Sequence, residues 1–317
     1  MPPPILPEAI MIQIRQLNAL LIALLLFSAC GTPTPDSDSS GIERQAGDSP
    51  AFWTVSDEDT TVHLFGTVHA LKPGTSWKTT EFDLAFDRLD ALYLEADIST
   101  TDVQQQIAVV IGQEGLFTDG TILNDYLTPN EQLLVDLAAE IVGLSPESLE
   151  NLRPWFVSRS LANLHIESLG YSISSGVDTV LFNDAKRKGI PRRYLENSED
   201  IFRKLGALPD EETADMLAVT ASDIVEDEGA VERLIASWKD GDVDRLGEFY
   251  NPEEGFGSEA VYDVMISNRN RAWIEQIDEL MRTEEGTFMI AVGAGHFAGP
   301  DSLIRMLENR GLTPFRR

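Results

Sequence analysis

The chain has 317 residues, of which 43% are hydrophobic and 8% aromatic, a composition typical of a globular protein with one large domain or two small ones. Its 53 Asp and Glu residues against 24 Lys and Arg give a formal net charge of −29. A surface this negative repels phosphate backbones, so we expect no nucleic-acid partner.

The first 30 residues have the features of an export signal. The apolar run LNALLIALLLF at 17–27 has the length of a signal-peptide core and is shorter than the ~20 residues that a membrane span needs. Ser28 and Ala29 then lead to Cys30, the only cysteine, so an intramolecular disulfide is excluded. This ending resembles the lipobox of bacterial lipoproteins, which implies lipidation of Cys30. A plain secretory signal with an incidental cysteine is the alternative, and Met11 is an alternative start.

Residues 31–50 (GTPTPDSDSSGIERQAGDSP) are rich in Pro, Ser, Gly and Asp. Such a segment cannot bury enough apolar surface to order itself, so we predict a disordered tether. The folded domain is expected over residues 51–317. Together these features predict an exported protein, lipid-anchored at the bacterial cell envelope in the outer membrane and facing the periplasm.

Strand patterns lie towards both ends of the folded part, and helical patterns fill its middle. The predicted strands are 51–55, 61–68, 91–96, 190–195 and 287–292, with the first two joined as a hairpin. Thr128, Pro129 and Glu131 form a predicted capping box at a helix start. Apolar spacing predicts further helices at 155–169, 177–188, 211–225, 231–238, 243–250, 260–281 and 302–310. We therefore predict a single α/β domain with a central mixed sheet, flanking helices and a large helical insertion.

Two histidines each follow a glycine by three residues at the end of an apolar strand. The sequence GTVH ends at His69, and GAGH ends at His296. Glycine at a strand end permits a sharp turn or the close approach of a ligand. In open α/β sheets ligands bind at the carboxyl ends of strands, so this pair of motifs indicates a functional site.

Glu95 is the third candidate, because it ends the buried strand ALYLE. A carboxylate at the end of a buried strand is costly unless a cation lies beside it, and a metal or an imidazolium would serve. The alternative is a glutamate that simply emerges into solvent. His63, inside a strand, and His165, on an amphipathic helix, are expected to have structural or surface roles.

The chain resembles the TraB/GumN family, within the wider group of Tiki proteases, erythromycin esterases and ChaN-like haem-uptake proteins. The resemblance runs from about residue 52 to 313, and its motifs agree in order and spacing. They are LFGTVHALKPGTSW, ALYLEADIS, LRPWF, GVDTVLFNDAKRKGIPRRYLE, SNRNRAWIEQI and AVGAGHFAGPDSLIRMLENRGL.

The Tiki resemblance implies a metal-dependent, peptidase-like hydrolase. His69, Glu95 and His296 would bind a divalent cation (Mn²⁺, Co²⁺ or Zn²⁺) that activates water. Glu196 is then the candidate general base or a partner that orients a histidine, and Arg269 the group that stabilises the oxyanion.

Asp178 and Asn270 match positions that recur in the family pattern, and we expect them to contact the ligand. The substrate would be a peptide or a small molecule. Two other functions stay open. The erythromycin-esterase resemblance implies a metal-free hydrolase in which a histidine, held by a carboxylate, activates water. The TraB and haem-uptake resemblances imply a lipoprotein without catalysis that sequesters a peptide or haem.

Overall fold

The computed structural model describes residues 49–97 and 99–317. The predictions of a signal peptide over residues 1–30, of lipidation at Cys30 and of a tether over most of 31–50 lie outside these described residues.

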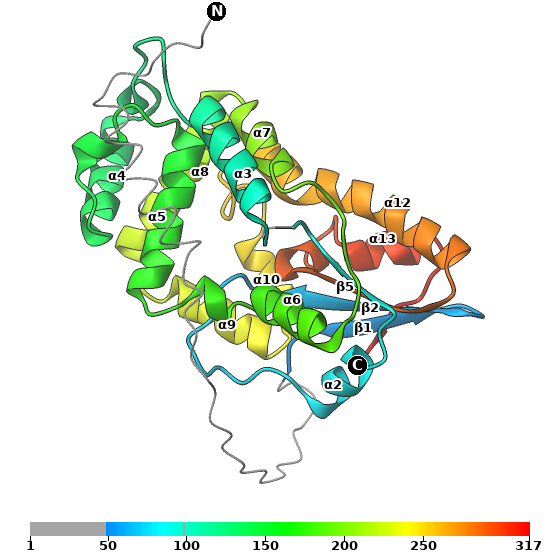
Figure 1. The fold of residues 1–317 in the computed structure, drawn as a ribbon. Coiled ribbons are helices and arrows are strands. Elements are labelled where there is room, and N and C mark those ends of the chain that lie inside the picture. Colours follow the sequence, from blue (N-terminus) through cyan, green and yellow to red (C-terminus); the bar gives the residue numbers. More distant parts are fainter. Residues whose placement is uncertain (1–48, 98) are drawn as a thin grey trace, which may run out of the picture. The chain divides into compact units, whose positions relative to one another are not determined.

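Six strands of the described chain form one mixed sheet in the order β4-β3-β5-β2-β1-β6. β4, β3, β5 and β2 run parallel to one another, and β1 pairs antiparallel with β2 as the predicted hairpin. The α/β fold with a mixed sheet in a single domain is thus confirmed (Figure 1). The strands are β1 (Phe52–Ser56), β2 (Thr60–Thr67), β3 (Ala91–Leu94), β4 (Arg192–Tyr194), β5 (Gly286–Gly293) and β6 (Phe315–Arg316).

Helices fill the connections between the parallel strands, which produces the predicted helical middle of the chain. The predicted capping box is confirmed, because the Thr128 side chain accepts from the Glu131 N–H and the Glu131 carboxylate accepts from the Thr128 N–H over 2.7 Å. The helices are α2 (Thr80–Phe86), α3 (Thr101–Glu114), α4 (Pro129–Ile141), α5 (Pro154–Ser168), α6 (Val177–Lys188), α7 (Asp200–Gly206), α8 (Asp210–Glu226), α9 (Ala230–Lys239), α10 (Val243–Phe249), α11 (Glu259–Tyr262), α12 (Asn268–Thr283) and α13 (Leu303–Asn309).

Helices cover both faces of the sheet, as Figure 1 shows. Alternate side chains of a strand point to opposite faces. Along β5, Phe288 and Ile290 pack into one apolar core beneath α12 and α13, while Met289 and Ala291 pack into the other, against α2, α6 and α9. The sheet is therefore buried on both faces, and its polar side chains gather at the strand ends.

The structure differs from the sequence-based prediction in one helix that bears on the site. The segment 260–281, predicted as one helix, is interrupted by a π-helical turn at Asp263–Ser267, and α12 begins only after it. Within this turn the Ser267 hydroxyl donates to the Asp263 carboxylate. Such turns insert an extra residue and are frequent at functional sites. Here the turn immediately precedes Arg269 and Asn270.

Candidate active site

The two histidine motifs lie at the same edge of the sheet because β2 and β5 are parallel neighbours. Their register places Thr67 of β2 opposite Gly293 of β5. β3 pairs with β5 on its other side and ends one position before Glu95. Three adjacent strands therefore bring His69, Glu95 and His296 to the carboxyl edge of the sheet.

Asp178 holds His69. The His69 Nδ1–H donates to Asp178 Oδ2 over 2.9 Å, and the Thr67 hydroxyl donates to Asp178 Oδ1 over 2.6 Å. The charge of Asp178 raises the pKa of His69 to about 9. The His69 side chain is 70% exposed, and within the described residues its Nε2 has no hydrogen-bond partner.

The buried guanidinium of Arg269 organises the other half of the site. Its Nε and Nη2 donate to the Glu196 carboxylate over 2.7 to 3.2 Å, and Nη2 also donates to Glu95. Its Nη1 donates to the Met265 carbonyl over 3.0 Å and to His296 Nε2 over 3.1 Å. These bonds use all five N–H groups of an arginine. The oxyanion role predicted for Arg269 would therefore require one of them to break.

Arg269 and Asn270 together fix the protonation of His296. Because arginine only donates, His296 Nε2 accepts, and its Nδ1–H donates to Asn270 Oδ1 over 2.7 Å. The Asn270 amide donates to the backbone carbonyls of His296 and Asp301 over 3.1 and 2.8 Å, which sets its orientation. Burial and the neighbouring Arg269 lower the pKa of His296 to about 3. His296 is therefore neutral and oriented at physiological pH.

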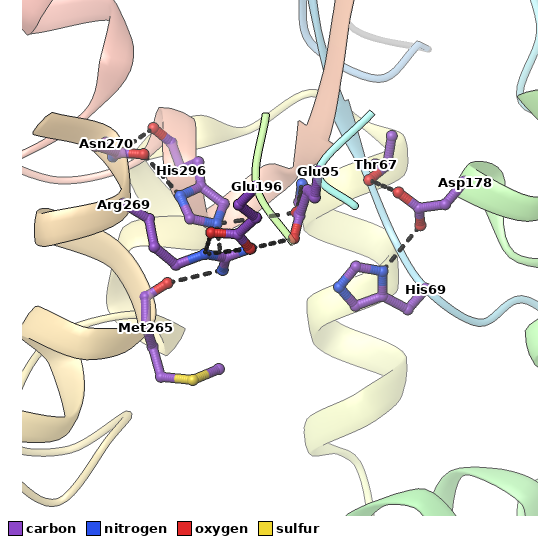
Figure 2. A network of polar contacts seen from close by, with 10 residues as sticks. Thr67, His69, Glu95, Asp178, Glu196, Met265, Arg269, Asn270 and His296 are labelled. Atoms are coloured by element: carbon purple, nitrogen blue, oxygen red, sulfur yellow. Dashed lines mark hydrogen bonds and ion pairs between the residues drawn. The ribbon is translucent and has the colours of Figure 1, made fainter. Parts of the chain in front are cut away.

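Glu95 and Glu196 share Arg269 but differ in pKa. Burial raises the pKa of a carboxyl group, and nearby positive charge lowers it. At Glu95 the effect of burial is outweighed by Arg269 and by the Gly293 N–H, which donates over 2.6 Å, and the pKa lies well below its usual range. At Glu196 burial prevails over Arg269, and the pKa is raised. Figure 2 shows this cluster on one side of Glu95 and the pair of His69 and Asp178 on the other.

Gly293 lies where the three predicted metal ligands converge. A Cβ added to it would lie 3.2 Å from Glu95 Oε1, 3.6 Å from His296 Cδ2 and 3.9 Å from His69 Nε2. Glu95 and His296 both accept from Arg269, whereas His69 Nε2 has no hydrogen-bond partner among the described residues.

Among the described residues, no group of three or more His, Cys, Asp and Glu side chains is arranged to hold a metal ion. In this arrangement the predicted ligands therefore do not fit a metal, and Arg269 is the cation that Glu95 was expected to need. Metal binding stays a prediction for experiment.

Two residues beside this edge were not identified from the sequence. Tyr250 follows α10, and its ring packs so closely on Gly295 that an added Cβ there would lie 2.8 to 3.0 Å from the ring. Burial and then the charge of Glu95 raise the pKa of Tyr250 to about 12, so its hydroxyl remains a proton donor. Gly295, the second glycine of GAGH, was the only sequence signal of this close approach. Arg159 of α5 gave no sequence signal.

The fold and site define an α/β protein with a polar site at the carboxyl edge of a mostly parallel sheet. Residues 51–316 match the TraB/PrgY/gumN family, and the chain belongs to this family. Two relatives, both called uncharacterized protein YbaP and found in Escherichia coli (strain K12) and Shigella flexneri, are each 27% identical over 251 residues. Each match covers 78% of this chain and 87% of the relative.

No solved structure matches the chain. Across residues 49–97 and 99–317, no helix is both long and apolar enough to cross a membrane.

Proposed function

We propose that the protein is a hydrolase in which His69, held by Asp178, activates a water molecule without a metal ion. The supporting observation is the hydrogen-bond chain from Thr67 through Asp178 to His69 Nδ1, which leaves Nε2 unpaired beside Gly293. A carboxylate that holds Nδ1–H fixes the ring so that Nε2 accepts a proton from water.

The pKa of His69 sets the pH range in which its ring can act as a base. Because its pKa is about 9, the free protein carries a protonated His69 at neutral pH. A substrate that covers the exposed ring removes water from it and lowers this pKa, since desolvation disfavours the charged form. We therefore expect activity to rise with pH up to about 9, on a limb that belongs to His69.

The remaining groups complete a hydrolytic cycle. As water adds to a substrate carbonyl, its proton passes to His69 Nε2, and the Tyr250 hydroxyl donates a hydrogen bond to the oxyanion. The protonated His69 then returns that proton to the leaving group as the bond to the carbonyl carbon breaks. Arg269 and Asn270 act as positioning residues, because their hydrogen bonds fix Glu95, Glu196 and His296.

The proposal is tested with the variants His69→Ala and Asp178→Asn. Measured near pH 9, where the wild-type His69 loses its proton, hydrolysis of 4-nitrophenyl acetate and of a mixed fluorogenic peptide library should fall by about 10²- to 10⁴-fold in kcat/KM, the usual contribution of a general base. Asp184→Asn is the matched control, because Asp184 lies on the same helix and pairs with Lys78 and Arg187. It should retain activity if it folds.

Thorough chelation separates this proposal from the metal-dependent prediction. Activity that survives chelation supports water activation by His69 alone. Activity that is lost and then restored by Mn²⁺, Co²⁺ or Zn²⁺ would overturn the metal-free proposal and favour a site built from His69, Glu95 and His296. Unchanged hydrolysis by His69→Ala would overturn both.

We further propose that the protein is exported and lipid-anchored through Cys30 at the bacterial outer membrane, facing the periplasm. The support is the apolar run at 17–27 and the single cysteine that follows it. Mass spectrometry of the mature N-terminus should find a lipidated Cys30. Cys30→Ser should release the protein from the membrane fraction. A mature chain that still begins before Cys30 would contradict this proposal.

A further inference from the structure

A surface cavity of about 370 Å³ lies beside the start of α6. Its lining residues come from two segments, 72–78 between β2 and α2, and 174–180 at the beginning of α6. Neither His69 nor Asp178 is among them. Its volume falls within the range of about 300–1,000 Å³ that is typical of small-molecule sites. The cavity is therefore separate from the proposed catalytic pair and large enough for a small organic ligand.

Backbone hydrogen bonds hold the two lining segments together. The Leu71 N–H donates to the Ser172 carbonyl over 3.2 Å, and the Ser172 N–H donates back to the Leu71 carbonyl over 2.9 Å. At the start of α6 the Val177 N–H donates to the Val68 carbonyl over 2.9 Å. A ligand in the cavity thus meets walls that are already positioned, which lowers the entropic cost of binding it.

The lining is rich in hydrogen-bond donors. None of the nine lining residues is Asp or Glu, although the whole chain has 53 acidic residues against 24 Lys and Arg. The hydroxyls of Ser76 and Ser175 make no hydrogen bond within the described residues. The lining side chains with an ammonium or a hydroxyl group are Lys72, Lys78, Thr75, Ser76, Ser174 and Ser175. This composition favours an anion as the ligand.

Both lysines have donors beyond those that their carboxylate partners use. Lys72 Nζ lies 3.4 Å from a Glu232 oxygen, in a pair whose side chains are 49% and 44% exposed, so that water weakens it. Lys78 donates to Asp184, which also accepts from Arg187 over 2.6 Å. One carboxylate faces two cations there, and this group of three keeps a net positive charge. Because an ammonium group has three N–H donors, each lysine can also bind an anion in the cavity.

Trp77 adds a donor to the wall of the cavity. The residue is 5% exposed, and its indole N–H makes no hydrogen bond in the part of the chain that the structure describes. Among the described residues, only His165 Nδ1 is a side-chain polar atom sealed from solvent without a partner. The Trp77 N–H is therefore reached by solvent, although its ring packs on Phe65 and Phe82. An unpaired donor on an almost buried residue is a feature of a site that accepts a ligand.

We propose that this cavity binds the phosphate group of a small phosphomonoester. A phosphate offers three strong acceptor oxygens, which match two ammonium groups, the unpaired hydroxyls and the Trp77 N–H. Lysine binds phosphate as a point charge. A carboxylate has only two oxygens and would leave more of these donors unpaired. The rest of the cavity accommodates the organic part of the ester. This site does not depend on the proposed hydrolase function.

The test compares glycerol 3-phosphate with inorganic phosphate, acetate and glycerol as probes. Binding to the full chain is followed by NMR through the indole N–H of Trp77, which is assigned among the five tryptophans with Trp77→Phe, and affinities are measured by calorimetry. The variants are Lys72→Gln, Lys78→Gln and Ser175→Ala. Lys188→Gln is the matched control, because Lys188 also pairs with an aspartate and lies over an aromatic ring, as Lys78 does, but does not line the cavity.

We expect glycerol 3-phosphate to shift the Trp77 signal and to bind more tightly than acetate by about tenfold or more, with no binding of glycerol. Lys72→Gln and Lys78→Gln should each weaken binding of glycerol 3-phosphate by about 10- to 100-fold, the usual effect of losing a hydrogen bond to a charged group. Ser175→Ala should weaken it by about 2- to 10-fold, because a neutral donor contributes less. Lys188→Gln should bind as the wild type does.

Equal binding of glycerol 3-phosphate and acetate, or an unmoved Trp77 signal, would overturn the phosphate site. An unchanged affinity in folded Lys72→Gln and Lys78→Gln would do the same. Inorganic phosphate that binds as tightly as glycerol 3-phosphate would overturn the ester and leave the free ion as the ligand. Thermal unfolding shows whether each variant is folded. If Lys78→Gln is unfolded, Lys72→Gln decides, because the side chain of Lys72 is half exposed.

Discussion

Replacing Asp178 with asparagine should change the pKa of His69 more than that of any other group. Asp178 is the main cause of the high pKa of about 9 at His69, whose ordinary value is 6.5. Without that charge, the only raising effect that remains is the smaller one of Glu95, and the charge of Arg159 opposes it. We therefore expect the pKa of His69 to fall well below about 9 in Asp178→Asn, so that the ring loses its proton at a lower pH than in the wild type.

The effect on folding stability should be much smaller than this pKa change suggests. Because the His69 side chain is 70% exposed, water screens the ion pair, and we expect it to contribute less than about 1 kcal/mol. A pKa raised by folding adds stability that is complete below 6.5 and is lost as the pH rises through about 9. The free energy of unfolding should show that small decline in the wild type and not in Asp178→Asn.

NMR titration of the histidine rings measures the change directly, since the chain has only four histidines. In the wild type, His63 is expected at about 4 and His296 at about 3, and the pKa of His165 is also lowered by burial. His69 is thus the only one expected to titrate on the alkaline side. A wild-type His69 that titrates near 6.5, or an Asp178→Asn substitution that leaves its titration in place, would refute the reasoning.

Three further predictions concern the opposite side of the site. The pKa of His296 is lowered to about 3, so the stability it contributes is complete above pH 6.5 and falls as the pH drops towards 3, by about 1.4 kcal/mol per pH unit. The free energy of unfolding, measured with urea at pH 7 and pH 5, should show this loss in the wild type and less of it in His296→Gln. The same loss between the two pH values in both proteins would contradict the prediction. Gly293→Ala should abolish hydrolysis with little change in the thermal midpoint, because the backbone there (φ −49°, ψ 136°) accepts alanine while the new Cβ fills the space among the three groups. Full activity in this variant would show that the space is not used. Elemental analysis of protein purified without chelator should find less than one equivalent of Mn, Co or Zn, and a stoichiometric metal would reverse the assignment of Arg269 as the resident cation.

The sequence predicted which parts of the chain meet at the site because strand ends are local features. The short apolar runs before GTVH and GAGH, and the run ALYL before Glu95, indicated strands, and parallel strands end at a common edge. The same reasoning failed for β6, which has two residues, is exposed and exists only through its pairing with β1. It also failed for α3, whose capping threonine Thr100 was not recognised.

Local sequence patterns could not predict which side chains on distant helices pair with the strand-end residues. Asp178 lies 109 positions from His69, and Arg269 lies 174 positions from Glu95. The sequence indicated that Glu95 needs a cation, but sequence alone does not distinguish a metal, an imidazolium and a guanidinium as that cation. Only the position of α12, which carries Arg269 into contact with Glu95 just after β3, selects the guanidinium. The family resemblance named the same residues without indicating which of them contact each other.

The central position of β5 has a consequence for how the chain is made. This strand is hydrogen-bonded to both β2 and β3, yet its residues are 286–293, near the end of the sequence. A growing chain therefore has the hairpin of β1 and β2 and the helices from α2 to α12, but no strand to join β2 to β3, until residues 286–293 have been synthesised. Parallel pairing across such separations is slow, because the ordering of a long loop precedes the contacts that stabilise it. The sheet can thus close only after β5 has been made, and the site, which needs the ends of β2, β3 and β5 together, forms with that closure.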